Sequence, residues 1–343
     1  MEKLSFLSDY NDGAHPAVLR ALAETNGLVT PGYGEDALCD RARALLREAC
    51  ACPGAAVWFL SGGTQTNATV IDAFLRPWQS AIAAETGHIN GHEAGAVEAT
   101  GHKVLPLPQR DGKIAAADLR AWLRSFYADE SRDHVVQPGM VYISQPTEYG
   151  PLYSLAELEA LSALCREYAL PLYADGARLA YALACPANDV TLPDLARLCD
   201  AFYVGGTKCG ALLGEAVVIP RSEALPHFFT VMKRHGAVLA KGRVLGVQFE
   251  ALFADGLYYE IGRRAVELAD RLRAALTERG YVLPVPSPSN QIFVSVDAAT
   301  LARLREKAAF NVWELHPDDS ALIRLVVGCS SPPEDVEALI ALL

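Results

Sequence analysis

Short apolar runs alternate with longer amphipathic stretches between about residues 55 and 220 of the chain. Five of these runs are predicted to be buried strands, at residues 55–60, 140–144, 170–174, 201–205 and 215–219. Runs that are apolar at nearly every position suit a sheet covered on both faces. The pattern therefore predicts an α/β fold.

The clearest helix is predicted between two of these strands, in the stretch SLAELEALSALCREY. Ser154 and Glu157 form an S-x-x-E capping box. Leucines then recur at three- and four-residue spacing, which gives this helix one apolar face. A strand, a capped helix and a second strand imply a right-handed βαβ unit and hence a parallel sheet.

The alternation of short apolar runs and helices changes after residue 246. A long amphipathic stretch over about 258–279 ends at Gly280, which suits a helix C-cap. Short strands are predicted at 291–296, 311–315 and 322–327. We therefore expect two domains: a large α/β domain with a mainly parallel sheet over residues 1–246, and a smaller α+β domain over residues 247–343.

The composition excludes several classes of protein. The 343 residues carry a formal net charge of −11, and the one basic cluster, 233–235, is too short for a phosphate-backbone footprint, which argues against nucleic acid as a partner. No apolar run has signal-peptide or membrane-spanning length. The eight cysteines are scattered without a C-x-x-C pair. This usage predicts a cytoplasmic protein in a reducing compartment.

Three stretches place reactive groups just after predicted strands, at the edge where α/β sheets build their sites. In FLSGGTQTNATV, two glycines lead into a helix that starts near Thr64, and the free N–H groups there could form an anion cup. The stretch lacks the G-x-x-x-x-G-K spacing of a P-loop, and a plain Gly-rich turn is the alternative.

The other two stretches carry charged groups. In LYADGARLAYAL, Asp175 ends a strand and Arg178 follows, which suits a carboxylate for a cationic ring nitrogen and an arginine for a carboxylate. An Asp–Gly turn with an internal ion pair is the alternative. In YVGGTKCGALLG, Lys208 follows the next strand with Thr207 beside it, and alone it could be an ordinary solvated lysine.

Taken together, an anion cup, an aspartate at a strand end and a lysine after the next strand match the needs of a pyridoxal 5′-phosphate (PLP) site. The lysine forms a Schiff base with the cofactor, the aspartate keeps the pyridine nitrogen protonated, and the helix start holds the phosphate. The combination is much more specific than any one stretch.

Over nearly its whole length the chain resembles the L-threonine aldolases, of the β-eliminating-lyase group of fold-type-I PLP enzymes. The resemblance lies in LSDY, GYGED, FLSGGTQTN, ETGHINGHEAGA, SQPTEYG, YADGARL, GGTK and IRLVV, in that order. It implies a PLP-dependent lyase that cleaves L-threonine, L-allo-threonine and related L-β-hydroxy-α-amino acids to glycine and an aldehyde. It also implies a homo-oligomer, as a rule a tetramer, with sites at a dimer interface.

The resemblance assigns a role to each matching residue. Lys208 is expected to bind the cofactor covalently, Asp175 to face its ring nitrogen, and His88 to stack on its ring near the substrate hydroxyl. The residues expected to hold the phosphate are Gly62, Gly63, Thr64 and Thr207. The residues expected to hold the substrate carboxylate are Ser8, Arg178 and Arg324, with Tyr33 reaching the neighbouring subunit's site.

Several of these residues have simpler interpretations. His88 and His92 are four residues apart with Glu93 beside them, but Ile89 stands where H-E-x-x-H needs its glutamate, so we expect no metal site. Arg324 lies in an apolar run, where either a structural ion pair or a bound substrate carboxylate could supply its missing partner. Tyr33, between two glycines, could be a simple turn residue.

The chain departs from the resemblance at two places. Glu148 stands where many of these aldolases have a histidine near the substrate hydroxyl, and a carboxylate could accept that proton directly or through water. The segment KRHGAVLAKGR replaces the usual Gly-rich stretch with an arginine. Lys241 is the candidate for a cationic phosphate contact there, with Arg243 as the alternative.

Two other functions stay open from the sequence alone. One is β-elimination from another amino acid on the same scaffold. The other is a non-catalytic α/β module that binds PLP or a nucleotide, with Lys208 as an ordinary phosphate contact.

Overall fold

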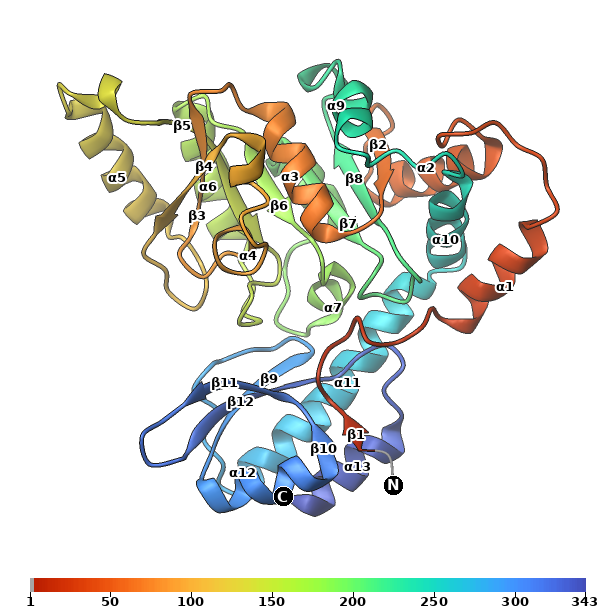
Figure 1. Ribbon diagram of the computed structural model, residues 1–343, viewed down its shortest axis with the longest axis vertical. Helices are drawn as coiled ribbons and strands as arrows, with labels where there is room; N and C mark the ends of the chain where they lie inside the picture. The colour runs from red at the N-terminus through yellow and green to blue at the C-terminus, as the bar shows by residue number, and fades with distance from the viewer. Residues whose placement is uncertain (1–2) are drawn as a thin grey trace.

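A seven-stranded sheet forms the centre of the larger part of the molecule (Figure 1). The structure is a computed structural model that describes residues 3–343, so the first two residues of the predicted large domain lie outside the described residues. The strands are ordered β2 (Ala56–Leu60), β8 (Glu215–Ile219), β7 (Ala201–Gly205), β6 (Leu172–Asp175), β5 (Gln137–Ser144), β3 (Gln79–Ala84) and β4 (Lys103–Leu107). All neighbours are parallel except β8, which runs antiparallel to β2 and β7. The five predicted strands and the mainly parallel sheet are confirmed, while β3 and β4 were not predicted.

Helices cover both faces of this sheet. Alternate residues of β7 enter two separate hydrophobic cores, with Phe202 and Val204 in one and Ala201 and Tyr203 in the other. The helices are α1 (Pro16–Thr25), α2 (Ala37–Ala49), α3 (Gly63–Phe74), α4 (His88–Gly91), α5 (Ala116–Ala128), α6 (Leu155–Glu167), α7 (Leu179–Ala184), α8 (Leu192–Leu198), α9 (Phe228–Arg234) and α10 (Arg243–Phe253). Short 3-10 turns lie at Glu98–Thr100, Arg132–His134 and Ser222–Ala224. A sheet buried on both faces explains why its strands are almost wholly apolar.

The predicted capped helix is α6, which connects the parallel strands β5 and β6. The Glu157 N–H donates to Ser154 Oγ (3.3 Å), and the Ser154 N–H donates to Glu157 Oε2 (2.8 Å). The capping box and the βαβ unit are therefore confirmed.

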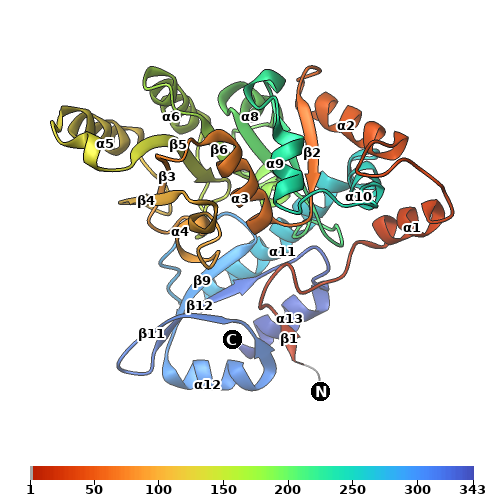
Figure 2. The same ribbon diagram turned by 45° about the horizontal axis from the view of Figure 1, so that its top comes forward.

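A second, smaller unit follows α11 (Leu257–Glu278), the long helix that runs from beside the central sheet into this unit (Figures 1 and 2). Its other elements are β9 (Gln291–Val296), α12 (Ala298–Lys307), β10 (Ala308–Ala309), β11 (Asn311–Leu315), β12 (Ala321–Val326) and α13 (Pro333–Leu342). The strands β11, β12 and β9 form an antiparallel sheet in that order. Helix α11 packs closely against α7 of the larger unit at Gly262. A Cβ at this position would lie only 2.1 Å from the Ala180 carbonyl oxygen, so the backbones can approach only because the residue is glycine.

The N-terminal segment belongs to both units. Strand β1 (Leu4–Ser5) pairs in parallel with β10 of the smaller unit, and the following residues then reach the larger one. The expected division after residue 246 falls inside α10. Among residues 3–343, no helix is both long enough and apolar enough to span a bilayer.

Candidate active site

A cavity of about 310 Å³ opens at the carboxyl edge of the central sheet, where β5 and β6 end. This is the edge at which α/β sheets bind their ligands, and the volume suits a small molecule. The predicted site residues that line it are Gly63, Thr64, His88, Glu148, Asp175, Arg178, Thr207 and Lys208.

Asp175 ends β6, and four donors surround its carboxylate. The Tyr203 hydroxyl (2.6 Å) and the Ala177 N–H (3.0 Å) donate to Oδ1. The Tyr142 hydroxyl (2.7 Å) and Asn67 Nδ2 (2.9 Å) donate to Oδ2. Burial raises the pKa of Asp175. The electrostatic effect of His88 and these hydrogen bonds together outweigh burial, so the pKa lies below its usual value. Because all four donors are neutral, Asp175 keeps a negative charge that they do not cancel.

A chain of hydrogen bonds links Asp175 to His88. Asn67 Nδ2 donates to Asp175 and also to Glu93 Oε1 (2.7 Å), and the same Glu93 oxygen lies 2.7 Å from His88 Nδ1. Burial raises the pKa of Glu93, although the bonds from His88 and Asn67 oppose that shift. A carboxylate acceptor at Nδ1 favours the tautomer with the proton on that nitrogen, which leaves Nε2 as the free ring nitrogen.

Glu148 lies on the loop after β5, on the other side of His88. Its Oε1 accepts from the His88 backbone N–H (2.8 Å) and from the Ser144 hydroxyl (2.6 Å). Burial raises the pKa of Glu148, and the Asp175 charge adds to that effect against these hydrogen bonds. Two carboxyl groups with raised pKa values therefore contact His88.

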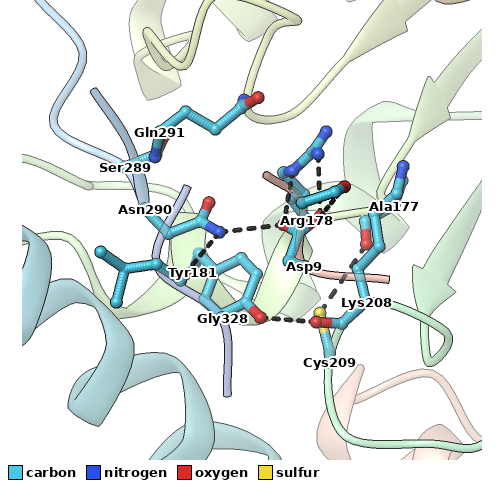
Figure 3. A network of polar contacts seen from close by, with 12 residues as sticks. Asp9, Ala177, Arg178, Tyr181, Lys208, Cys209, Ser289, Asn290, Gln291 and Gly328 are labelled. Atoms are coloured by element: carbon cyan, nitrogen blue, oxygen red, sulfur yellow. Dashed lines mark hydrogen bonds and ion pairs between the residues drawn. The ribbon is translucent and has the colours of Figure 1, made fainter. Parts of the chain in front are cut away.

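Lys208 follows β7 and projects into the cavity, with Nζ 5.8 Å from the centre of the Tyr10 ring. The Tyr181 hydroxyl donates to its backbone carbonyl and holds this part of the loop (Figure 3). Desolvation and the Arg178 charge lower the pKa of Lys208, against the attraction of Asp9 and Asp175. A lowered pKa makes the neutral, nucleophilic amine more available.

The predicted anion cup is the start of α3. Gly62 is the N-cap and makes no side-chain capping bond, so the first N–H groups of the helix keep their donor capacity. Gly63 approaches the Tyr203 hydroxyl so closely that a Cβ there would lie 3.2 Å from it. Across the cavity, the Thr207 hydroxyl accepts from the Gly214 N–H (3.0 Å). The cup thus combines a helix start with a side-chain hydroxyl, as a phosphate requires.

Arg178 makes a bidentate ion pair with Asp9, a partner that the sequence did not predict (Figure 3). Its Nε and Nη2 donate to Asp9 Oδ2 (2.7 Å) and Oδ1 (2.9 Å). Asn290 Nδ2 also donates to Asp9 Oδ2 (2.9 Å), and burial of Asp9 is outweighed by these partners, so its pKa is lowered. Two donors of Arg178 are therefore committed to Asp9, and its remaining donors are left for a ligand.

Arg324 lies on β12 in the smaller unit. It donates to Gln291 Oε1 (3.1 Å) and Asn311 Oδ1 (2.8 Å), and its guanidinium lies 5.1 Å from the Trp313 ring centre. Within the described chain it forms no ion pair, and its buried Nε has no hydrogen-bond partner. Burial lowers the pKa of Arg324 to about 10. A guanidinium whose hydrogen-bond partners are all neutral suits an incoming carboxylate better than a structural ion pair.

The remaining predicted residues do not line this cavity; they are Gly62, Ser8, Tyr33, Lys241 and Arg324. Ser8 is buried, and its hydroxyl lies 3.5 Å from Asp9 Oδ1. Tyr33 is half-exposed beneath the ammonium group of Lys233 (4.1 Å), and Lys241 is exposed.

Arg243, the alternative to Lys241, donates to the backbone carbonyls of Thr25 (2.8 Å) and Asn26 (3.3 Å) at the end of α1. These bonds give it a structural role. His92 lies on the cavity wall, with its ring centre 5.7 Å from that of His88. Within residues 3–343 no group of three or more His, Cys, Asp or Glu side chains has the arrangement of a metal site.

Sequence reasoning missed several polar residues that the fold brings to the site, among them Asp9, Asn67, Glu93, Tyr203 and Glu215. Asn67 and Glu93 both lie within recognised motifs, FLSGGTQTN and ETGHINGHEAGA. A search of those motifs for hydrogen-bonding partners of Asp175 and His88 could have found them. Asp9 also lies within a recognised motif, LSDY, but nothing in that motif indicates Arg178 as its partner. Glu215 carries no comparable local signal.

The cavity fits PLP on three counts. Its uncancelled carboxylate at Asp175 suits a protonated ring nitrogen, its desolvated amine at Lys208 suits a carbonyl, and the N–H groups at Gly63 suit a phosphate. These groups lie at or just after the ends of β2, β6 and β7, three strands of one mainly parallel sheet. They define a PLP-dependent enzyme of fold type I.

The comparison with known proteins specifies the family. The sequence model of the family described as beta-eliminating lyase matches residues 6–299. The chain belongs to the beta-eliminating lyase family, and it is a lyase.

Individual relatives agree with this assignment. The chain is 30% identical over 313 residues to a low specificity L-threonine aldolase of Pseudomonas sp. (strain NCIMB 10558), covering 88% of this chain and 87% of the relative. It is 41% identical to the solved threonine aldolase of Leishmania major, with a TM-score of 0.95 over 98% of this chain and 97% of that one. An aspartate aminotransferase double mutant of Thermus thermophilus shares the fold at 14% identity, with a TM-score of 0.73 over 99% of this chain and 91% of that one.

Proposed function

We propose that this protein cleaves L-threonine, L-allo-threonine and related L-β-hydroxy-α-amino acids to glycine and an aldehyde. The observation that carries the proposal is His88, whose Nδ1 is bonded to the buried Glu93 while Glu148 holds its backbone N–H in the same cavity as Lys208. Aldol cleavage needs a group that removes a hydroxyl proton beside the reacting carbon, and this arrangement supplies two candidates. The names of the Pseudomonas and Leishmania relatives support the same reaction.

Bound PLP supplies an electron sink for the pair of electrons that the broken Cα–Cβ bond leaves behind. Lys208 is proposed to bind it covalently, Asp175 to keep its ring nitrogen protonated, and His88 to stack on its ring. Its phosphate would be held by Gly62, Gly63, Thr64 and Thr207. The lowered pKa of Asp175 supports its part, because only an ionised carboxylate stabilises a protonated ring nitrogen.

The substrate carboxylate is proposed to bind Arg324, which has only neutral partners in the described chain. Arg178 would contribute its uncommitted donors, and Ser8 its hydroxyl. Two fixed cations at one end of an amino acid determine which bond at its α-carbon faces the base.

The hydroxyl proton is proposed to pass to Nε2 of His88 or to Glu148. His88 Nε2 is free because Glu93 engages the other ring nitrogen. Because the pKa of Glu148 is raised, it lies closer to the working pH, which suits a group that accepts and returns a proton. A water bridge from Glu148 would serve the same purpose.

We further propose a cytoplasmic homo-oligomer, a tetramer built from dimers. Tyr33 and Lys241 support the oligomer, because both are exposed and neither lines the cavity of its own chain. Each would act at the neighbouring subunit's site, Lys241 on the phosphate. Leu28 and Val29, on the loop between α1 and α2, are also exposed, as an interface requires.

The test is incubation of the purified protein with L-threonine, followed by measurement of glycine and acetaldehyde. Lys208→Ala is expected to abolish both products together with the borohydride-reducible visible absorbance. Glu148→Gln is expected to slow aldehyde release much more than it weakens glycine binding. Pyruvate and ammonia in place of glycine and aldehyde would show β-elimination and refute the proposal.

A further inference from the structure

Glu215 is a buried carboxyl group at the phosphate end of the cavity. It begins β8, is 3% exposed, and lines the cavity beside Thr207. In the pairing of β2 with β8 it stands opposite Leu60, the last residue before the turn into the anion cup. If Glu215 ionises, its negative charge lies next to the anion cup, where the cofactor phosphate is proposed to bind.

The protein gives this carboxyl few means of holding a negative charge. The Gly206 N–H donates to its Oε2 (3.0 Å), and within the described chain no cation forms an ion pair with it. The pKa of Glu215 is raised to about 7. Burial is the main cause, and the charge of Asp175 acts in the same direction, whereas the Thr207 hydroxyl, the Gly206 N–H and the Lys208 charge lower the pKa. The phenols of Tyr173 and Tyr203 face the same region and are neutral, since burial raises their pKa well above its usual value.

The Thr207 hydroxyl lies near this carboxyl on the cavity wall and lowers its pKa. A hydroxyl has one proton to donate and two lone pairs to accept with. One lone pair of Thr207 accepts from the Gly214 N–H (3.0 Å), and its proton is directed at the Gly214 carbonyl over a long distance of 3.5 Å, a weak bond that a better acceptor can replace. An ionised Glu215 would attract the hydroxyl proton and turn the other lone pair toward the phosphate. A protonated Glu215 can donate to that lone pair instead, which frees the hydroxyl proton for a phosphate oxygen.

We propose that Glu215 carries a proton in the cofactor-bound protein and donates it to Thr207, so that Thr207 in turn donates to the cofactor phosphate. The proposal rests on the phosphate role of Thr207 and is independent of which amino acid the enzyme cleaves. A phosphate dianion disfavours a second anion in a poorly solvated cavity, so binding stabilises the protonated form of Glu215.

The first test observes the phosphate of the holoenzyme by phosphorus NMR from about pH 6 to pH 9. The wild type is expected to show a shift of the signal with a midpoint at or above about pH 7, as Glu215 loses its proton. Glu215→Gln removes this step, whereas the matched cavity variant Glu148→Gln retains it. The visible absorbance of the same samples follows titration at Lys208, so a wild-type phosphorus signal that moves only with the absorbance overturns the proposal.

The second test compares cofactor affinity of the full-length chain at a pH of about 8. Glutamine keeps an N–H donor for Thr207, so Glu215→Gln is expected to bind PLP within about threefold of the wild type. Glu215→Leu has no donor and is expected to bind on the order of tenfold more weakly. Equal weakening by both substitutions would contradict the donor role, and tighter binding by the leucine variant would contradict it as well.

Discussion

Asp175→Asn tests whether the carboxylate in the site is held by its hydrogen bonds. Asparagine has the same shape but places an N–H₂ group where one oxygen was. The hydroxyls of Tyr203 and Tyr142 can rotate and accept from it, but the Ala177 N–H on one side and Asn67 Nδ2 on the other cannot. Whichever way the new amide turns, it meets a donor that cannot adapt.

Asn67 is prevented from turning by its other contacts. Its Oδ1 accepts from the Tyr173 hydroxyl (2.9 Å), and its Nδ2 donates to Glu93 (2.7 Å), so a flipped amide would direct oxygen at a carboxyl group. One buried N–H left unpaired costs about 1–3 kcal/mol. Loss of the charge gives no compensation, because the pKa of Asp175 is already below its usual value. We expect the midpoint temperature of the apoprotein to fall by about 1–4 °C.

The assay is thermal unfolding of the apoprotein for Asp175→Asn, Asn67→Ala and the double variant. Removing Asn67 opens one orientation for the new amide, so the double variant should be more stable than the sum of the single effects predicts, by about 1 kcal/mol. Additive losses would refute this account of the network, as would a D175N midpoint equal to that of the wild type.

Three further predictions follow from other contacts. Glu93→Ala removes the acceptor at His88 Nδ1, so the ring proton is no longer held on that nitrogen. The kcat for aldol cleavage should fall roughly 10²-fold with little change in KM, and an unchanged kcat would contradict the orientation of His88. Arg324→Gln should raise KM for L-threonine about tenfold or more and leave the visible absorbance of the cofactor unchanged, whereas Asn311→Ala, which removes only a neutral partner, should change KM much less. The pKa of Glu215 is about 7 in the folded chain and about 4.5 in the unfolded chain, so its contribution to stability is present below pH 4.5 and is lost as the pH rises to about 7. Between those two pH values the free energy of unfolding of the wild-type apoprotein, measured by denaturant titration, should fall by roughly 3 kcal/mol more than that of Glu215→Gln. Equal falls in the two proteins would contradict the raised pKa.

The sequence predicted those parts of the fold that depend on local pattern. Apolar runs identified the central strands, and the S-x-x-E signal identified α6. Strands β3 and β4 were missed because Gln79–Ala84 is mostly small residues and Lys103–Leu107 is an edge strand containing a proline, so neither has a strong apolar run. The pairing of β1 with β10 joins residues about 300 positions apart, and no local pattern announces it.

The site divides in the same way. Asp175 and Lys208 were found because each directly follows an apolar strand, and strand ends converge at one edge of the sheet. The partner of Arg178 could not be found in this manner, since Asp9 is 169 residues away and reaches it only through the path of the N-terminal segment. Glu215 was counted only as the first residue of a strand, and its place beside the cup depends on the antiparallel register of β8.

The path of the N-terminal segment, from β1 to Asp9, determines which part of this protein could be exchanged with that of a relative. Strand β1 is paired with β10, and a few residues later Asp9 is bonded both to Arg178 of the larger unit and to Asn290 of the smaller one. A chimaera that takes only the C-terminal unit from a relative would combine one parent's Asp9 segment with the other parent's β10 and Asn290. The segment that can be recombined intact is therefore discontinuous: it consists of the C-terminal unit together with the chain from β1 to Asp9.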